Sequence, residues 1–194
     1  MYGLLFSSQK LADSTSNRIE AIQIARDGLE AIINIRDTNW TLYAADYKNC
    51  WNVLNYESGC IWVSGTTGDI NHAVNQWFKI YRDSENKFRL SLWSYSAWDS
   101  YTDSSYRAAF AIRKDLSWFY TQSGGTIYGV WSDPFYTREI QVNYIDDSWN
   151  LAWSTASDNN TLEAKVTVQW IDTTKQEPQK LEMSTVLTNW KAKK

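Results

Sequence analysis

The chain has 194 residues, which is enough for one domain with a substantial hydrophobic core. Its formal net charge of −3 and sequence pI of about 5.2 predict no general electrostatic attraction to nucleic acid. Two prolines and eight glycines are too few for a low-complexity linker, and the sequence shows no internal repeat.

The first predicted element is a long amphipathic helix over residues 17–40. Apolar side chains recur at spacings of three and four in two adjacent rows, while charged side chains such as Arg26 and Glu30 fall on the other side. A glycine in a helix interior costs about 1 kcal/mol relative to alanine, so we interpret Gly28 as a close approach to another element, most simply a sheet. Asn17 and Glu20 form a local helix-start signal, and the sequence Asp-Thr-Asn-Trp from Asp37 is expected to end the helix. The two rows are Ile22, Ala25, Leu29, Ile32 and Ile33, and Ala21, Ile24, Gly28, Ala31 and Ile35.

Two cysteines, Cys50 and Cys60, follow the helix in a stretch rich in tryptophan and asparagine. In an extracytoplasmic protein they would form a disulfide that closes a short loop, whereas in a cytosolic protein they would remain thiols. Together with the single His72 they do not supply the four ligands of a structural zinc ion.

The remainder of the chain is predicted to form an antiparallel sheet. Apolar and polar residues alternate with period two, most regularly between Leu162 and Trp170. Strands with one solvated face leave an apolar face for the helix to cover, which predicts an α+β fold. Expected strands are 78–82, 87–93, 138–144, 162–170 and 181–187, with turns at 83–86 and 173–178.

Residues 94–130 fit this pattern less well. Residues 99–105 and 122–126 are expected to be loops, and residues 107–120 suit either a short helix or a strand. Loops on a rigid scaffold often carry function, so this insertion is a candidate functional surface.

The sequence contains no catalytic constellation. It lacks a Gly-x-Ser-x-Gly elbow, a phosphate-binding glycine-rich loop and a paired-histidine metal motif. A lone histidine such as His72 without identifiable partners is more often structural than catalytic. Several loops carry carboxylates, which we interpret as solvated charge rather than calcium ligands or glycosidase acids. We therefore expect no enzymatic activity, no cofactor and no metal. The acidic loop residues are Asp99, Asp103, Asp146, Asp147 and Asp158.

Twelve tryptophans and twelve tyrosines form the most unusual part of the composition. Most are expected in the core, because each aromatic side chain buries roughly 150–250 Å². Five border polar loops and are candidates for stacking against a glycan or a partner protein. They suggest, as an alternative function, a stand-alone secreted carbohydrate-binding or adhesion module. These residues are Trp93, Tyr95, Trp98, Trp149 and Trp153.

Five segments of the chain resemble prepilin-type proteins of the type IV pilin and type II secretion pseudopilin superfamily, especially minor-pilin-like members. Residues 25–30 and 35–40 resemble the part of the pilin helix that follows the membrane span, and residues 187–190 resemble the closing Leu-Thr-Asn-Trp. Residues 133–140 resemble a Phe-x-Arg-x-Ile strand, and residues 166–170 resemble a Val-x-Val-x-Trp strand. The segments occur in the family's order and bracket nearly the whole chain.

The resemblance implies a pilin-like fold in which one continuous helix, over about residues 4–37, packs across an antiparallel sheet. Residues 1–38 would be the spine helix and residues 39–194 a β-rich head. Its implied partners are other pilin subunits in a filament, and the inner membrane before assembly. The processing motif and membrane span of the family are not in this sequence, so we interpret it as the soluble part of such a protein.

The implied function is that of a structural subunit of a type IV pilus or a related secretion filament, with the head displayed outside the membrane for surface or host-cell adhesion. Display outside the cytoplasm would make Cys50 and Cys60 a disulfide. The resemblance does not distinguish a pilus from a secretion pseudopilus or a competence pilus. The expected contacts between helix and sheet are Ile22, Ala25, Gly28, Leu29, Ile32, Trp40 and Trp190.

Overall fold

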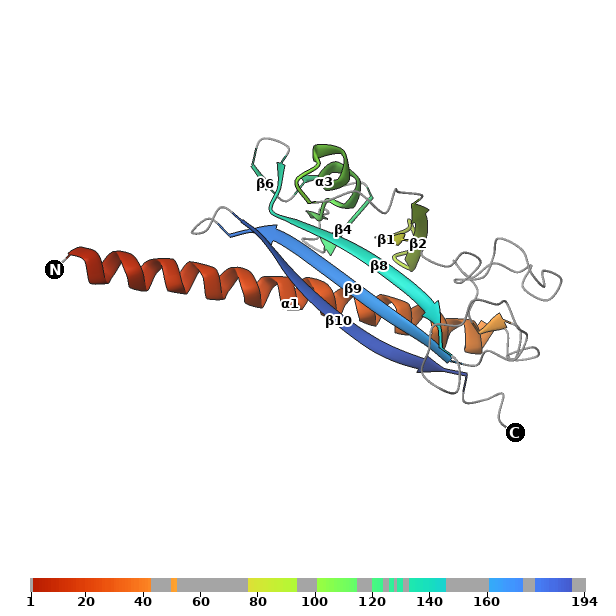
Figure 1. The fold of residues 1–194 in the computed structure, drawn as a ribbon. Helices are drawn as coiled ribbons and strands as arrows, with labels where there is room; N and C mark the ends of the chain where they lie inside the picture. Colours follow the sequence, from red (N-terminus) through yellow and green to blue (C-terminus); the bar gives the residue numbers. More distant parts are fainter. Residues whose placement is uncertain are drawn as a thin grey trace.

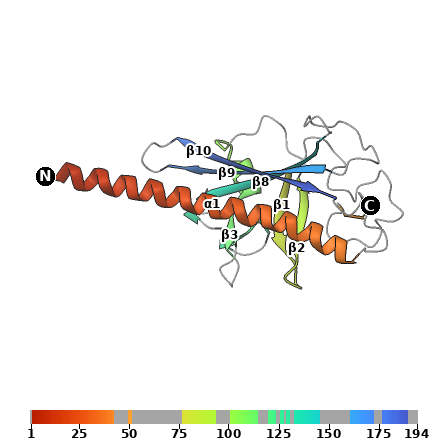
Figure 2. The same cartoon turned by 90° about the horizontal axis from the view of Figure 1, so that it is seen from below.

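A long helix lies across one face of a five-stranded antiparallel sheet in the computed structural model (Figures 1 and 2). The structure describes residues 2–42, 50–51, 77–93, 101–114, 120–123, 126–127, 129–130, 133–145, 161–172 and 177–189. The strand order is β10-β9-β8-β1-β2. This arrangement confirms the predicted α+β class. The main elements are α1 (Tyr2–Leu42), β1 (Trp77–Arg82), β2 (Phe88–Trp93), β8 (Tyr136–Tyr144), β9 (Thr161–Ile171) and β10 (Pro178–Thr188).

Helix α1 is continuous through the polar stretch around Asn17, so the local start signal there does not begin a new helix. The predicted end at Asp37 is wrong, because the helix continues to Leu42. No proline or glycine follows Asp37 until Gly59, so the local sequence does not force an end. Asn39 and Trp40 are buried, and the Asn39 amide donates to the carbonyl of Trp51 at 3.3 Å. Tertiary packing therefore extends the helix past the expected corner.

The buried face of α1 is centred on the second of the two apolar rows. Ile22 and Ile33 are only partly buried, whereas Leu29 is buried and Arg26 and Glu30 are exposed. At Gly28, an added Cβ would lie 3.2 Å from both Cγ atoms of Val166 on β9. The helix thus approaches the sheet closely at a position where it has no side chain. The fully buried apolar residues of the helix are Ala21, Ile24, Ala25, Ala31, Ile32 and Ile35.

Alternation along the strands supplies the other half of the core. Even-numbered positions of β8 and β9 face the helix, and these two strands are paired without interruption from Tyr136↔Trp170 to Tyr144↔Leu162. The predicted hairpin is confirmed, with β1 and β2 joined by a turn in which Asn86 has φ 61°. The buried core residues of the sheet are Phe78, Ile80, Leu90, Tyr136, Ile140, Val142, Leu162, Ala164, Val166, Val168, Trp170 and Leu187.

Residues 101–134 add a short helix and several two-residue strands. Asp103 caps α3 by accepting a hydrogen bond from the backbone N–H of Ser105 at 2.7 Å. The segment that suited either helix or strand contains parts of both, because α3 ends at Phe110 and β3 begins at Arg113. The added elements are α3 (Ser104–Phe110), β3 (Arg113–Lys114), β4 (Tyr120–Thr121), β5 (Thr126–Ile127), β6 (Gly129–Val130) and β7 (Asp133–Pro134).

Leu29→Ala should lower the free energy of unfolding by about 2–5 kcal/mol, because it removes a buried side chain between helix and sheet. Glu30→Ala, one residue further along, should change it by less than about 0.5 kcal/mol because Glu30 is exposed. Thermal unfolding measures both, at roughly 2–4 °C per kcal/mol for a chain of this size. Equally small shifts for the two variants would mean that the helix does not depend on this contact.

Candidate assembly surface

The N-terminal part of α1 extends beyond the sheet (Figure 1), and most of its described side chains are exposed. Leu11 is 70% exposed and Ile19 is 52% exposed, with the exposed Thr15 between them. These residues are four apart, so they lie along one side of the helix. We call Leu11, Thr15 and Ile19 the projecting stripe. Large apolar side chains at such exposure are the kind of surface that a partner protein covers.

Polar contacts fix the direction in which this segment leaves the head. Glu20 accepts hydrogen bonds from Tyr120 at 2.6 Å and from Tyr136 at 3.2 Å. Tyr136 also contacts the carbonyl oxygen of Asn17 at 3.2 Å. Charged acceptors make stronger hydrogen bonds than neutral ones. The helix is therefore held to β4 and β8 at the point where its apolar contacts with the sheet begin.

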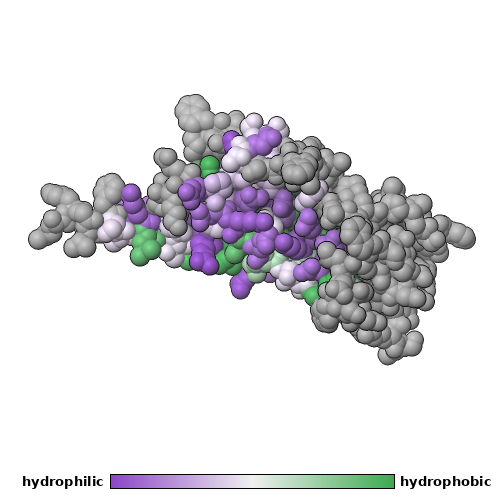
Figure 3. Space-filling view, in the orientation of Figure 1, coloured by the Kyte–Doolittle hydropathy of each residue, from purple (hydrophilic) through white to green (hydrophobic). Residues whose placement is uncertain are grey.

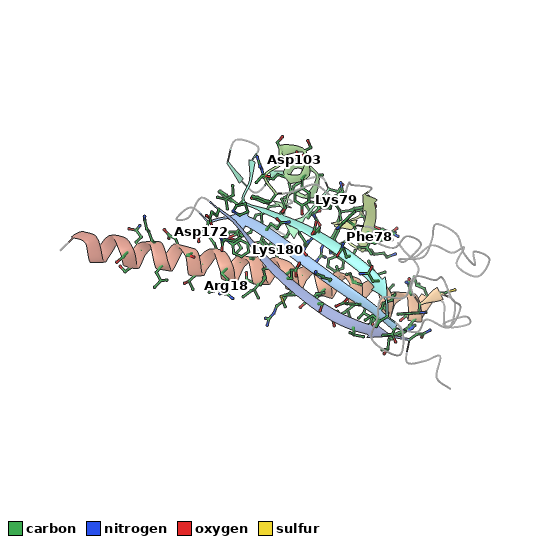
Figure 4. The ribbon with its side chains drawn as sticks, in the orientation of Figure 1. Arg18, Phe78, Lys79, Asp103, Asp172 and Lys180 are labelled. Carbon is green, nitrogen blue, oxygen red and sulfur yellow. The ribbon has the colours of Figure 1, made fainter. Side chains whose placement is uncertain are left out.

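A second contact lies six residues nearer the N-terminus, at Ser14. Ser14 donates a hydrogen bond to the carboxylate of Asp172 at 3.1 Å, and Asp172 is 3% exposed at the end of β9. Figure 4 labels Asp172 there, together with Arg18 on the projecting part of the helix. The helix thus has polar contacts with β4, β8 and the end of β9 before it extends into solvent.

A charged side chain is fully buried in the interface: Arg138 on β8 is 0% exposed. Its Nη1 atom forms an ion pair with Asp27 at 2.6 Å and donates to the carbonyl oxygen of Ile24 at 3.2 Å. Its Cδ atom lies 3.3 Å from the position that a Cβ on Gly28 would occupy. The guanidinium group is therefore enclosed between sheet and helix, with two of its partners on α1.

Gln122, just after β4, is a further partner of Arg138. Its Oε1 accepts from Arg138 Nε at 3.2 Å and from the backbone N–H of Ile80 at 3.0 Å. Its Nε2 donates to the carbonyl oxygens of Phe110 and Arg138, and its own N–H donates to Ile80. Strands β1 and β8 pair directly only through Trp77 and Phe78. Beyond these residues, Gln122 bridges the two strands.

The opposite face of the sheet is largely polar, as the hydrophilic colouring of Figure 3 shows. Helix α3 packs there, and Tyr106 donates to the Glu139 carboxylate at 2.7 Å and accepts from Gln169 at 2.9 Å. Burial raises the pKa of Glu139, although the Tyr106 hydrogen bond opposes this shift. Burial and the neighbouring Glu139 carboxylate raise the pKa of Tyr106 well above its usual value.

The residues expected to join helix and sheet are buried to different extents. Ala25, Ile32 and Gly28 are buried against the sheet and Trp40 is 6% exposed, whereas Ile22 lies at the margin of the contact. Trp190 lies outside the described residues, so its packing stays a prediction.

The predicted stacking residues and acidic loops fall almost entirely outside the described residues. The backbone of Trp93 ends β2, but its side chain is not described; Asp103 is the N-cap of α3. Cys50 is buried and disulfide-bonded, while Cys60 lies outside the described residues, so their pairing stays a prediction. Also outside are Tyr95, Trp98, Trp149, Trp153, His72, Asp99, Asp146, Asp147 and Asp158.

The sequence interpretation missed Arg138, Gln122 and Glu20. A signal for Arg138 was present, because in the expected strand 138–144 it has the same parity as the apolar residues Ile140 and Val142 and therefore shares their face of the sheet. An arginine in an inward-facing row requires a buried partner. Gln122 gave no comparable signal, since it lies in a segment expected to be a loop.

Among the described residues, no three histidine, cysteine or acidic side chains lie close enough together to hold a metal ion. No described helix combines the length and the apolar content needed to span a membrane. The chain matches no protein-family model, and no curated protein or solved structure is detectably similar to it.

Asp27→Ala should lower the free energy of unfolding by roughly 3–5 kcal/mol, because it leaves the buried Arg138 without its counter-charge. The matched control is Asp37→Ala on the same helix, which also loses an arginine partner. Because Asp37 is 51% exposed, its removal should cost no more than about 1 kcal/mol. Urea denaturation of both variants measures the difference. Similar losses for the two variants would contradict a dominant role for the buried pair.

Glu139→Gln should stabilise the protein near neutral pH. The raised pKa means that folding disfavours the ionised carboxylate, so the native protein loses stability as pH rises from the unfolded pKa through the folded one. The amide keeps an acceptor for Tyr106 and does not ionise. The stability that the variant gains over the wild type should therefore shrink as pH falls from the folded pKa of Glu139 to its unfolded pKa, and it should disappear below about pH 4. Melting temperatures between pH 3.5 and 7.5 measure it, with Glu163→Gln on β9 as comparison; a gain that does not change with pH would overturn the assignment.

Proposed function

We propose that this protein is a structural subunit of a type IV pilus or a related secretion filament, in which α1 packs against neighbouring subunits and the β-rich head is displayed outside the membrane. The observation that carries the proposal is the division of α1 into two parts. Residues 21–40 bury an apolar face against the sheet, whereas the projecting stripe at Leu11, Thr15 and Ile19 is exposed.

The projecting segment is poorly supported by its own chain. Most helix stability in proteins comes from packing an apolar face, and this segment of α1 has few such contacts with the described residues of the head. Leu11 and Ile19 provide such a face, but the described residues of the head do not cover it. A neighbouring subunit would cover it, and the polar contacts of Glu20 and Ser14 hold the segment in position to be covered.

The geometry of this contact suits a filament. In the proposed filament, the stripe on the N-terminal part of the helix packs against a different surface of a neighbouring subunit. Contacts between unlike surfaces repeat from one subunit to the next, and they form an open helical assembly when the rotation does not close. The arrangement of helix and antiparallel sheet is consistent with the pilin-like resemblance of the sequence.

Display outside the cytoplasm is supported by Cys50. This buried cysteine is disulfide-bonded, and structural disulfides persist mainly in oxidising compartments. The family resemblance adds the expectation of an anchor in the inner membrane before assembly. The alternative of a stand-alone carbohydrate-binding module rests on aromatic side chains outside the described residues, so no described contact favours it.

Antibodies against the head should label filaments sheared from cells that produce the protein, in negative-stain electron microscopy. Leu11→Glu should reduce the protein in the sheared fraction at least about tenfold, since it places a charge in an apolar contact. Gln9→Glu provides the control, because it introduces the same charge into the same segment on another side of the helix. Both variants should keep the wild-type melting temperature, since both positions are exposed.

Two results would reject the proposal. The first is absence of the protein from any filament. The second is an equal yield of Leu11→Glu and wild-type protein in the sheared fraction.

A further inference from the structure

β10 is the outermost strand of the sheet and is paired along only one side in the part of the chain that the structure describes. Its pairing with β9 is unbroken from Pro178↔Ile171 to Thr188↔Thr161. The N–H and C=O groups along its other side are oriented to continue the sheet. A long, regular edge of this kind is a template for pairing with another strand.

The side chains of β10 leave this edge open to an added strand. On the helix side, Leu181 and Met183 pack against the core but are only partly buried. On the outer side, Lys180 and Glu182 are 55% and 40% exposed (Figure 4 labels Lys180). A strand placed beside β10 would cover the remaining apolar surface on one face and meet both charges on the other.

The charge pattern shows which strand fits. When a strand pairs antiparallel with a second copy of itself, a two-fold axis relates the two copies. The axis must pass through a residue that lies opposite its own copy. If it passed between two residues instead, side chains that face the helix would lie opposite side chains that face outward. With Leu181 at the axis, Lys180 of each copy lies opposite Glu182 of the other. Moving the axis to Lys180 or to Glu182 instead places like charges opposite each other, which is unfavourable.

We infer that β10 pairs antiparallel with β10 of a second copy of this chain, in the register that places the two Leu181 residues opposite each other. The pairing extends the sheet across a two-fold axis and forms two cross-strand pairs between Lys180 and Glu182. In each subunit, Glu182 also accepts from Lys180 at 2.6 Å and from Lys165 at 3.0 Å. The cross-strand pairs join these internal contacts into one network along the interface.

This dimer uses a surface different from the projecting stripe and does not depend on the proposed filament. Sedimentation equilibrium of the full chain should show a reversible monomer–dimer equilibrium. Glu182→Lys or Lys180→Glu alone replaces two attractive pairs with two repulsive ones, so each should raise the dimer Kd about tenfold or more. The double exchange K180E/E182K restores opposite charges and should return the Kd to within about threefold of the wild-type value.

Two controls separate the interface from changes within the subunit. Glu85→Lys reverses an exposed charge in the turn between β1 and β2, at the opposite edge of the sheet, and should leave the Kd unchanged. Leu11→Glu should also leave it unchanged. A monomer at all concentrations, a Kd insensitive to the single reversals, or failure of the double exchange to restore pairing would overturn the inference. Loss of the dimer in Leu11→Glu alone would assign association to the helix, which rejects the β10 interface while leaving the filament proposal intact.

Discussion

The buried guanidinium of Arg138 determines where the helix and the sheet can meet. A fully buried cation is tolerated only when charge and hydrogen bonds compensate for lost hydration, which otherwise costs several kcal/mol. Here the compensation comes from Asp27 and Ile24 on α1 and from Gln122 beside β1. These groups must be in place together. Arg138 therefore links three features of the fold: the position of the helix, the divergence of β1 from β8, and the path of the chain at Gln122. The missing side chain at Gly28 provides the space for this arrangement.

The apolar contacts around this site are less specific than the polar ones. Alanine, isoleucine and valine side chains would allow the helix to move along the sheet at modest cost, because hydrophobic attraction is non-directional. The ion pair at Arg138 and the two hydrogen bonds to Glu20 have fixed geometry and lie two turns apart on α1. Two such contacts on a rigid helix define both its position and its direction. We infer that burial supplies most of the stability of the interface, whereas these contacts select its register.

Sequence patterns predicted those parts of the fold that local periodicity controls. The amphipathic repeat of α1, the alternation in β8 and β9 and the β1–β2 hairpin depend on neighbouring residues, and the structure has all three. The end of α1 at Leu42 depends instead on tertiary contacts such as Asn39 with Trp51. Two-residue strands such as β4 are too short for any periodicity to develop. The pair between Arg138 and Asp27 joins positions 111 residues apart, so its partner could not be identified from sequence, although the inward-facing parity of Arg138 indicated that one was needed.

The exposed helix and the exposed strand edge differ in the kind of assembly they favour. In the proposed filament, the projecting stripe would meet an unlike surface of its neighbour, and such a contact repeats without limit when the rotation does not close. The edge of β10 would meet an identical edge, and such a contact closes after two subunits. Because the two contacts use different residues, neither excludes the other through shared side chains. A protein with both can join two growing filaments side by side or enter a filament as a pair. The ratio of the two contact strengths, rather than either alone, would then decide whether isolated or paired filaments form.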